Sequence, residues 1–312
     1  MRAAQITEYG GADVLAYTDS AEQPIPKAKQ VLVEVYAAGV NPFDWKVREG
    51  LMRSMAEPAL PATLGGDCAG IVAAVGEEVT DFEIGQAVFG QAGALSGKGS
   101  YAEYTCVKAN ALALKPESVD FATAAALPLA SVSAYQTLVD HMQLQAGQRI
   151  LIHGGAGGIG TLAIQLAKQR GAYVITTATA ADRDFVIGLG ADEVIDYQTQ
   201  NFADILSGLD AVYDTIGGDT NKKSYGLLKP GGVLVSMVEP ADEAIASEHQ
   251  ITYTFQFTSV TTERLNEIAA LVDAGKLKTN VDKVFPLQAA AEALEYLKTA
   301  HPRGKVVITV KS

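Results

Sequence analysis

The sequence predicts an α/β protein in which a β-rich unit is joined to a doubly wound parallel sheet. In the first third of the chain, short apolar runs are separated by Gly and Pro, which is typical of a compact unit of many short strands. From about residue 120, apolar strands alternate with amphipathic helices, as in parallel βαβ folds. A glycine-rich turn at residues 154–160 joins one of these strands to its helix.

Composition limits the class of protein. The chain has 312 residues, of which 48% are hydrophobic and 19% charged, so it can form a large core in one or two domains. Its net charge of −12 argues against a nucleic-acid partner, because such partners need clustered Lys and Arg. Two cysteines, Cys68 and Cys106, are too few for a disulfide framework, which fits a cytoplasmic protein. The most apolar stretch, 121–139, is interrupted by Pro128 and by polar residues, so we expect no membrane partner.

Alternation of side chains predicts the strands of the β-rich unit. Val31, Val33 and Val35 recur with the two-residue period of a strand. Glycines close the next two apolar runs and act as turn signals. The further strands predicted for this unit cover residues 69–75, 87–89 and 101–107.

The parallel sheet is predicted to begin with a strand at residues 149–153. The helix after the glycine turn carries an apolar stripe from Ile159 to Ala167 at helical spacing, and Gly171 can end it in the left-handed conformation. Later strands of this sheet are predicted at residues 172–177, 193–195, 211–215 and 233–237, with helices at 182–189 and 221–228.

The last part of the chain returns to mixed character. Helices are predicted at residues 263–274 and 289–299, and a final strand at residues 305–310. Because the backbone groups of a lone strand need partners, we expect this strand to rejoin the β-rich unit.

The glycine turn satisfies the pattern G-x-G-x-x-G, with glycines at positions 155, 157 and 160. It stands between an apolar strand and an amphipathic helix, which is the context of a dinucleotide-binding turn. Glycines let the backbone approach a pyrophosphate, whose charge lies at the helix N-terminus. The candidate binding residues of this turn are Gly154, Gly155, Ala156, Gly157, Gly158, Ile159 and Gly160.

The end of the next strand favours NADP(H) over NAD(H). NAD-dependent proteins usually have an acid about 20 residues after the glycine turn, for the ribose 2′-hydroxyl. Here the strand ends near Thr177 and Thr179, and the first carboxylate, Asp182, follows on the next helix. The small hydroxyl residues leave room for a 2′-phosphate, and the guanidinium of Arg183 can pair with it. Asp182 is the residue that argues for NAD(H) instead.

Six segments of the sequence carry a family resemblance. They lie at residues 39–46 (GVNPFDWK), 64–70 (LGGDCAG), 99–104 (GSYAEY), 153–160 (HGGAGGIG), 189–197 (LGADEVIDY) and 301–305 (HPRGK). In this order they resemble the zinc-free medium-chain dehydrogenases/reductases, in the branch that holds quinone oxidoreductases, ζ-crystallin and enone reductases. The resemblance covers essentially the whole chain.

This resemblance implies a domain organisation and a cofactor. A GroES-like catalytic domain would be formed by residues 1–120 and 260–312, and a Rossmann domain that binds NADP(H) by residues 121–259. It also implies a homodimer. The candidate contact is the segment 251–257, whose aromatic residues alternate with polar ones as in an edge strand that needs cover.

The same resemblance makes the missing zinc ligands informative. Zinc alcohol dehydrogenases of this superfamily have Cys at the position of Asn41, and Gly-His-Glu where this chain has Gly-Asp-Cys at residues 66–68. Their four-cysteine zinc lobe cannot be built from two cysteines. We therefore expect no metal site, and hydride transfer to a small acceptor that is already electrophilic, either a quinone or an α,β-unsaturated carbonyl compound.

Further site residues follow from the resemblance. The segment 41–46 faces the nicotinamide in the family, so Asn41, Asp44 and Lys46 are candidate catalytic residues. Lys46 could instead be a surface lysine, and Asp44 could brace the turn. The other candidate cofactor contacts are Ser133, Tyr197, Thr215, Gly217, Arg303 and Lys305. The structural alternative is a small residue in a packed helix for Ser133 and a core aromatic for Tyr197. For Arg303 and Lys305 it is a position that flanks a strand.

Motifs also bear on other enzyme classes. No G-x-S-x-G elbow occurs, and the glycine turn is not followed by Lys-Ser or Lys-Thr, so a hydrolase and a P-loop protein are set aside. An enoyl-thioester reductase and a non-enzymatic, crystallin-like NADPH-binding protein remain alternatives, because a fold does not fix a function.

Overall fold

The computed structural model describes residues 1–311, so residue 312 of the predicted segment 260–312 lies outside the described chain. Two compact units make up the fold. Unit 1 consists of Met1–Val132, Val260–Gly275 and Thr279–Ser312, and unit 2 of Ser133–Ser259 and Lys276–Lys278. Unit 1 contains two sheets and unit 2 one.

A seven-stranded sheet forms the centre of unit 1. Five strands run in the order β16-β3-β5-β6-β8, β15 covers the free edge of β16, and β7 pairs with β3. A smaller sheet has the order β2-β1-β4. The strands are β1 (Ala3–Ile6), β2 (Leu15–Thr18), β3 (Gln30–Val40), β4 (Ala62–Thr63), β5 (Asp67–Val75), β6 (Ala87–Gln91), β7 (Tyr104–Lys108), β8 (Leu112–Leu114), β15 (Val281–Pro286) and β16 (Lys305–Thr309).

The predicted return of the chain end is confirmed. β16 pairs antiparallel with β3, so Val306 lies opposite Val40 although the two residues are far apart in the sequence. One predicted strand was too long: residues 101–107 form a strand only from Tyr104. The reason is that the backbone of residues 101–103 bonds elsewhere, with Tyr101 N donating to Leu64 O and Glu103 N to Arg2 O.

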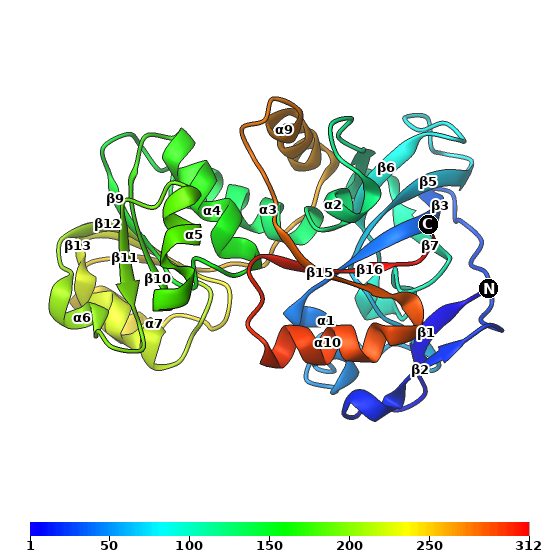
Figure 1. Cartoon of the computed structure of the whole chain (residues 1–312), viewed down its shortest axis with the longest axis horizontal. Coiled ribbons are helices and arrows are strands. Elements are labelled where there is room, and N and C mark those ends of the chain that lie inside the picture. The colour runs from blue at the N-terminus through cyan, green and yellow to red at the C-terminus, as the bar shows by residue number, and fades with distance from the viewer. Residues whose placement is uncertain (312) are drawn as a thin grey trace. The chain divides into compact units, whose positions relative to one another are not determined.

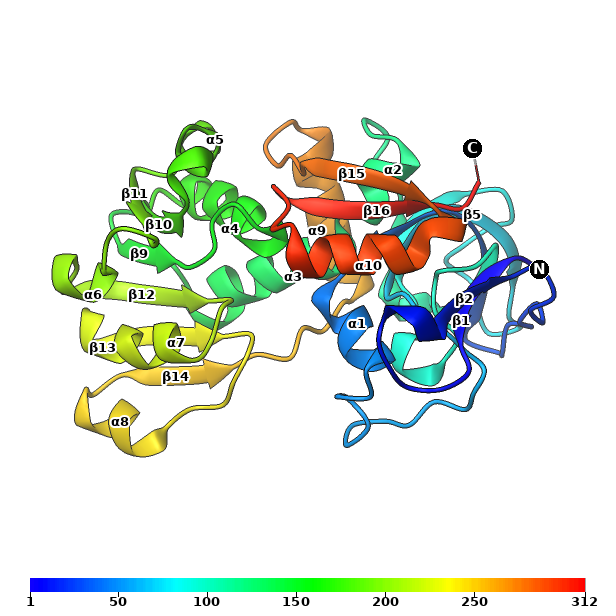
Figure 2. The same ribbon diagram turned by 60° about the horizontal axis from the view of Figure 1, so that its bottom comes forward.

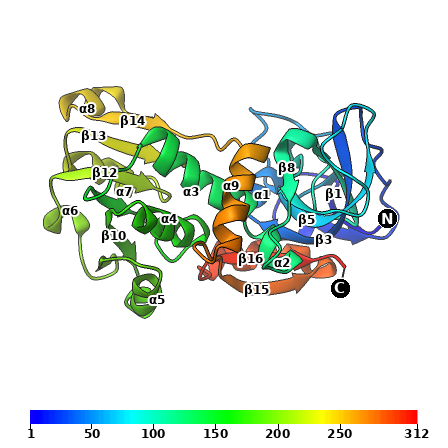
Figure 3. The ribbon, with the colours of Figure 1, turned by 90° about the horizontal axis from the view of Figure 1, so that it is seen from above.

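Helices cover the sheet of unit 1. α10 lies along β15 and β16 and also contacts α1 (Figure 2). α9 packs against β8 (Figure 3). The helices outside the parallel sheet are α1 (Pro42–Arg48), α2 (Phe121–Ala125), α3 (Pro128–Tyr135), α9 (Thr262–Asp273) and α10 (Ala290–Thr299), and the short 3-10 turns are η1 (Ala12–Val14), η2 (Ala94–Ser96), η3 (Ala109–Ala111) and η7 (Leu287–Ala289).

Unit 2 is a doubly wound parallel sheet, as predicted. Its six strands have the order β11-β10-β9-β12-β13-β14, and every pair is parallel. Successive residues of β9, such as Ile150 and Leu151, are both 0% exposed. Because neighbouring side chains of a strand point to opposite faces, both faces of the sheet are covered. The strands are β9 (Arg149–Ile152), β10 (Tyr173–Ala178), β11 (Glu193–Asp196), β12 (Leu209–Asp214), β13 (Leu228–Ser236) and β14 (Thr252–Phe255).

The crossover helices of unit 2 lie near their predicted positions. α4 and α5 pack against β9, β10 and β11, and α7 packs against β12 and β13 (Figure 1). Gly171, after α4, has φ +78°, the left-handed conformation expected at this helix end. The elements are η4, a π-helix (Gln136–His141), α4 (Gly158–Gln169), η5 (Ala180–Asp182), α5 (Arg183–Gly188), α6 (Phe202–Ile205), α7 (Asp219–Ser224), η6 (Tyr225–Leu227) and α8 (Glu243–Glu248).

Two expectations about surfaces can be compared with the fold. The segment predicted as an edge strand forms β14, at the end of the parallel sheet, while the homodimer itself stays a prediction. Within the described residues, no helix combines the length and the apolar character needed to cross a membrane.

Candidate functional site

Close backbone contacts shape the glycine turn of unit 2. A Cβ atom on Gly155 would lie 2.0 Å from Thr176 Oγ1, and one on Gly160 would lie 2.2 Å from Gly154 O. Gly154 has φ +70°, which L-residues with a side chain rarely adopt. These three positions therefore require glycine for the turn itself.

The turn leads directly into α4, and no side chain caps the first N–H groups of this helix. α4 begins at Gly158, and its N-cap is Gly157, which makes no side-chain capping bond. The first N–H groups of a helix have no partner within the helix and carry its positive dipole end. A cradle of small residues at such an end fits a pyrophosphate.

The residues predicted to select the dinucleotide lie around the end of β10. Thr179 Oγ1 donates to Asp182 Oδ2 at 2.7 Å, so the first acid after this strand is engaged by a hydroxyl. Arg183 Nη1 donates to Val194 O at 3.0 Å. Tyr197 is 52% exposed, so the alternative of a core aromatic is wrong.

Thr177 was predicted as a cofactor contact, but its hydroxyl is already engaged by the protein. Thr177 is 4% exposed. Its Oγ1 accepts a hydrogen bond from Gly154 N at 3.0 Å and lies 3.3 Å from His153 Nδ1. The Thr177 side chain therefore binds the backbone N–H of Gly154, at the start of the glycine turn.

The carboxyl ends of β9 and β12 meet at a buried carboxylate. Asp214 Oδ1 accepts hydrogen bonds from Ile216 N and Gly217 N, each at 2.9 Å. Gly217 has φ +80°, and Thr215 Oγ1 donates to His153 O at 2.9 Å. Thr215 and Gly217 were predicted from the sequence and Asp214 was not, although an acid that directly ends an apolar strand is a signal for such a turn.

Ser133 lies at the start of unit 2 and is 0% exposed. Its Oγ lies 2.7 Å from Thr258 Oγ1, so the two hydroxyls share a hydrogen bond. Gln256 Nε2 donates to Ser133 O at 3.1 Å. The hydroxyl predicted near the nicotinamide is thus fixed by the segment after β14.

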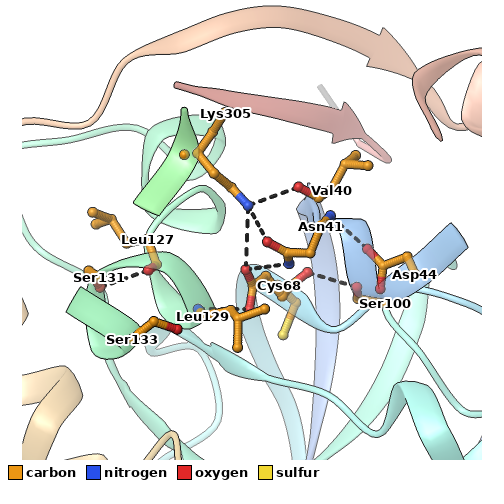
Figure 4. Close-up of polar contacts among 12 residues, drawn as sticks. Val40, Asn41, Asp44, Cys68, Ser100, Leu127, Leu129, Ser131, Ser133 and Lys305 are labelled. Atoms are coloured by element: carbon orange, nitrogen blue, oxygen red, sulfur yellow. Dashed lines mark hydrogen bonds and ion pairs between the residues drawn. The ribbon is translucent and has the colours of Figure 1, made fainter. Parts of the chain in front are cut away.

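A cluster of buried polar side chains lies at the start of α1 in unit 1 (Figure 4). Asp44 Oδ2 accepts hydrogen bonds from Asn41 N and Tyr101 Oη, both at 2.8 Å. The first of these bonds reaches back over the first turn of the helix, so the predicted brace of this turn is present. Asp44 and Asn41 are 1% and 3% exposed.

The carboxamide of Asn41 is held at both ends (Figure 4). Its Nδ2 donates to Asp67 Oδ2 at 2.8 Å, and its Oδ1 accepts a hydrogen bond from Lys305 Nζ. Lys305 Nζ also donates to Val40 O at 2.8 Å and lies 4.0 Å from Asp67 Oδ2. Because the reversed amide would face a cation with its NH2 group and an anion with its oxygen, the orientation of Asn41 is fixed.

Burial shifts the pKa values of the ionisable side chains in this cluster. Burial raises the pKa of Asp44 to about 7, although hydrogen bonds from Asn41 and Tyr101 oppose the shift. It raises the pKa of Asp67 to about 6, against the attraction of the Lys305 ammonium. Burial lowers the pKa of Lys305, and the two acids oppose that shift.

Two other predicted residues of unit 1, Lys46 and Arg303, lie outside this cluster. Lys46 is half-buried, and its Nζ lies 5.7 Å from the centre of the Trp45 ring. Arg303 is exposed, and its backbone binds Asn280 Nδ2 and Asp282 Oδ1. Lys305, predicted beside Arg303 as a cofactor contact, belongs to the cluster and directs its ammonium to the start of α1.

Residues 1–311 contain no group of three or more His, Cys, Asp or Glu side chains that could hold a metal ion. Cys68 and Cys106 are free and buried. Burial raises the pKa of the Cys68 thiol to about 12, and its Sγ donates to Gly90 O.

Family models match both ends of the chain. The alcohol dehydrogenase GroES-like domain matches residues 27–117, and the zinc-binding dehydrogenase model matches residues 189–308. The NADPH-dependent alkenal/one oxidoreductase of Arabidopsis thaliana chloroplasts is 38% identical over 317 residues, which is 99% of this chain and 79% of that protein.

Solved structures resemble the whole chain. The quinone oxidoreductase of Coxiella burnetii has a TM-score of 0.93 and 35% identity, and the match covers 100% of this chain and 99% of that one. The Escherichia coli quinone oxidoreductase complexed with NADPH has a TM-score of 0.90 and 28% identity over 99% of this chain and 100% of that one.

The raised pKa of Asp44 predicts how Asp44→Asn changes stability with pH. In the folded protein Asp44 keeps its proton up to about pH 7, whereas the unfolded chain releases it near pH 4. The wild type therefore loses stability as pH rises from 4 to 7, and the neutral Asn, whose oxygen can accept both hydrogen bonds, does not.

We expect the free energy of unfolding of Asp44→Asn, relative to wild type, to increase by about 2 kcal/mol between pH 5 and pH 7. Urea denaturation at several pH values measures it. His153 is present in both proteins and does not contact Asp44, so its titration cancels in the difference. The charge of Asp67 is one cause of the raised pKa of Asp44 and is therefore part of the measured effect. Parallel stability profiles of the two proteins would contradict the burial of an acid at this position.

Proposed function

Because the chain belongs to the quinone oxidoreductase and enone reductase branch of the medium-chain dehydrogenase/reductase family, we propose that it transfers a hydride from NADPH to a quinone or an α,β-unsaturated carbonyl compound. The observation that carries the proposal is the glycine turn before α4, whose backbone contacts exclude side chains at three positions. In this proposal, residues 1–120 with 260–312 form the catalytic domain and residues 121–259 the cofactor domain.

The cofactor supplies the hydride, and the protein binds and orients it. We assign the pyrophosphate to the glycine turn and the N-terminus of α4. Thr179, Arg183 and Tyr197, around the carboxyl ends of β10 and β11, would receive the adenosine part. We place Ser133, Thr215 and Gly217 on the nicotinamide side, and we propose Arg303 as a further contact from unit 1.

The acceptor needs stabilisation of negative charge. When a hydride adds to the β carbon of an enone, charge develops on the carbonyl oxygen, and a nearby donor lowers the barrier. We propose Lys46 as the cation and Asn41 as the N–H donor for this oxygen. Asp44 and Lys305 act through Asn41, because one binds its backbone N–H and the other its carboxamide oxygen.

Charge stabilisation by these side chains would replace a Lewis acid. In zinc alcohol dehydrogenases a metal polarises the substrate oxygen. Here Asn41 and Asp67 stand at positions of zinc ligands in that class, and they bind each other and Lys305. We therefore propose that the activity does not depend on zinc.

Cofactor preference is the first prediction of this proposal. We expect a lower KM for NADPH than for NADH, because no acid ends β10 and Asp182 is engaged by Thr179. Arg183→Ala should raise the KM for NADPH by about tenfold, the effect of one charge-assisted contact, and leave the KM for NADH unchanged.

Steady-state kinetics with both cofactors measure this effect. Arg170→Ala is the matched control, because Arg170 also donates to a main-chain carbonyl, that of Leu144, and should leave both KM values unchanged. If the wild type prefers NADH, the assignment of a 2′-phosphate to the site around Arg183 is wrong.

The role of Lys46 gives a second prediction. We expect Lys46→Ala to lower kcat for an enone by about 10²-fold, as when one preorganised donor is lost. The loss for a reactive quinone should be smaller, because its reduced form needs less stabilisation. Cofactor binding should change little.

Lys46→Arg is the control, because it keeps the positive charge and should retain most of the activity with the enone. Initial rates with saturating NADPH measure both variants. If Lys46→Ala stays within about twofold of wild type for both acceptors, under half a kcal/mol, the residue does not take part in the chemistry.

A further inference from the structure

A buried histidine connects three elements below the glycine turn. His153 follows β9 and is 0% exposed. Its Nδ1 lies 3.3 Å from Thr177 Oγ1 on β10, and its Nε2 lies 3.0 Å from Ser224 Oγ at the end of α7. Because all three side chains are buried, each polar atom needs a partner within the protein.

The hydrogen atoms of this chain of contacts can be assigned. Ser224 Oγ donates its only hydrogen to Thr220 O at 2.7 Å, so toward His153 it can only accept. His153 therefore carries its hydrogen on Nε2. Burial lowers the pKa of His153 to about 4, against the attraction of Asp214, so the ring is neutral and Nδ1 must accept.

It follows that Thr177 donates its only hydrogen to His153 Nδ1. The same oxygen then accepts from Gly154 N at 3.0 Å. Each group donates to the next in one direction, from Gly154 through Thr177, His153 and Ser224 to the carbonyl of Thr220. Within this series of hydrogen bonds, neither Thr177 nor Ser224 has a hydroxyl hydrogen left to donate to a ligand.

Thr177 also holds the next residue of the turn. Gly155 N donates to Thr177 O at 3.0 Å, so two consecutive N–H groups of the turn are bound to one residue of β10. The backbone of Gly155 is already in close contact with the Thr176 side chain, since a Cβ atom on Gly155 would lie 2.0 Å from Thr176 Oγ1. Small changes in the Thr177 side chain are thus transmitted to the backbone of the turn.

We propose that Thr177 is a positioning residue, which His153 and Ser224 hold in one orientation, and that it sets the path of the glycine turn for the pyrophosphate of a dinucleotide. This inference rests on the proposed function, in which the turn binds NADPH. It gives Thr177, predicted as a cofactor-binding residue, an indirect role through the backbone of the turn.

The two roles predict different cofactor selectivity. NADPH and NADH share the pyrophosphate, so a displaced turn weakens both by the same factor. Loss of a contact to the 2′-phosphate weakens only NADPH. The ratio of the two dissociation constants therefore separates a positioning residue from a selectivity residue.

Thr177→Val is the test variant, because valine has the shape of threonine without the hydroxyl. Thr177→Ser keeps the hydroxyl and is the matched control. Fluorescence titration of each protein with NADPH and with NADH, without acceptor, gives the Kd values. We expect Thr177→Val to raise both Kd values about tenfold with their ratio unchanged within twofold, and Thr177→Ser to stay within about threefold of wild type.

Three results would overturn the inference. Weakening of NADPH alone by Thr177→Val would make the hydroxyl a 2′-phosphate contact, and unchanged binding of both cofactors would remove its role. A wild type that bound neither dinucleotide would overturn the proposed function and this inference with it. Should Thr177→Val fail to fold, Ser224→Ala breaks the same chain farther from the turn and should weaken both cofactors equally.

Discussion

The close contacts that the glycine backbone makes in the turn before α4 are the constraint on which the rest of unit 2 depends. Gly155 lies against Thr176 and Gly160 against Gly154, at distances that leave no room for a Cβ atom. Only because these side chains are missing can the chain leave β9, turn within a few residues and enter α4 at Gly158. The same contacts leave the first N–H groups of α4 uncapped and ready for an anion.

In unit 1, buried charge has the corresponding role. Lys305 and Asp67 are buried at opposite ends of the Asn41 carboxamide, and a buried ion pair of this kind adds little net stability. Its effect is specificity of orientation, because only one arrangement of the amide satisfies both charges. The pair also ties the last strand of the chain to the junction of β3 and α1. The chemistry that we propose for Asn41 depends on that fixed orientation.

The sequence predicted the parts of this account that depend on local patterns. The periodic apolar residues predicted most helices and strands, and the glycine spacing predicted the turn before α4, because both signals lie within about ten neighbouring residues. It could not predict the contact of Lys305 with Asn41, which spans 264 positions and depends on the antiparallel pairing of β16 with β3. Thr177 shows the other limit: its position was recognised, but its role is decided by His153 and Ser224, which pattern alone does not bring together.

In the activity that we propose, a hydride passes from NADPH to the electrophilic carbon of the acceptor. The most direct measurement uses NADPH that carries deuterium at both C4 positions, together with a panel of simple enones, followed by NMR of the product. We expect one deuterium at the β carbon and solvent hydrogen at the α carbon, since the hydride comes from the cofactor and the proton from water or the protein. A product with solvent hydrogen at the β carbon, or no oxidation of NADPH with any enone or quinone, would contradict it.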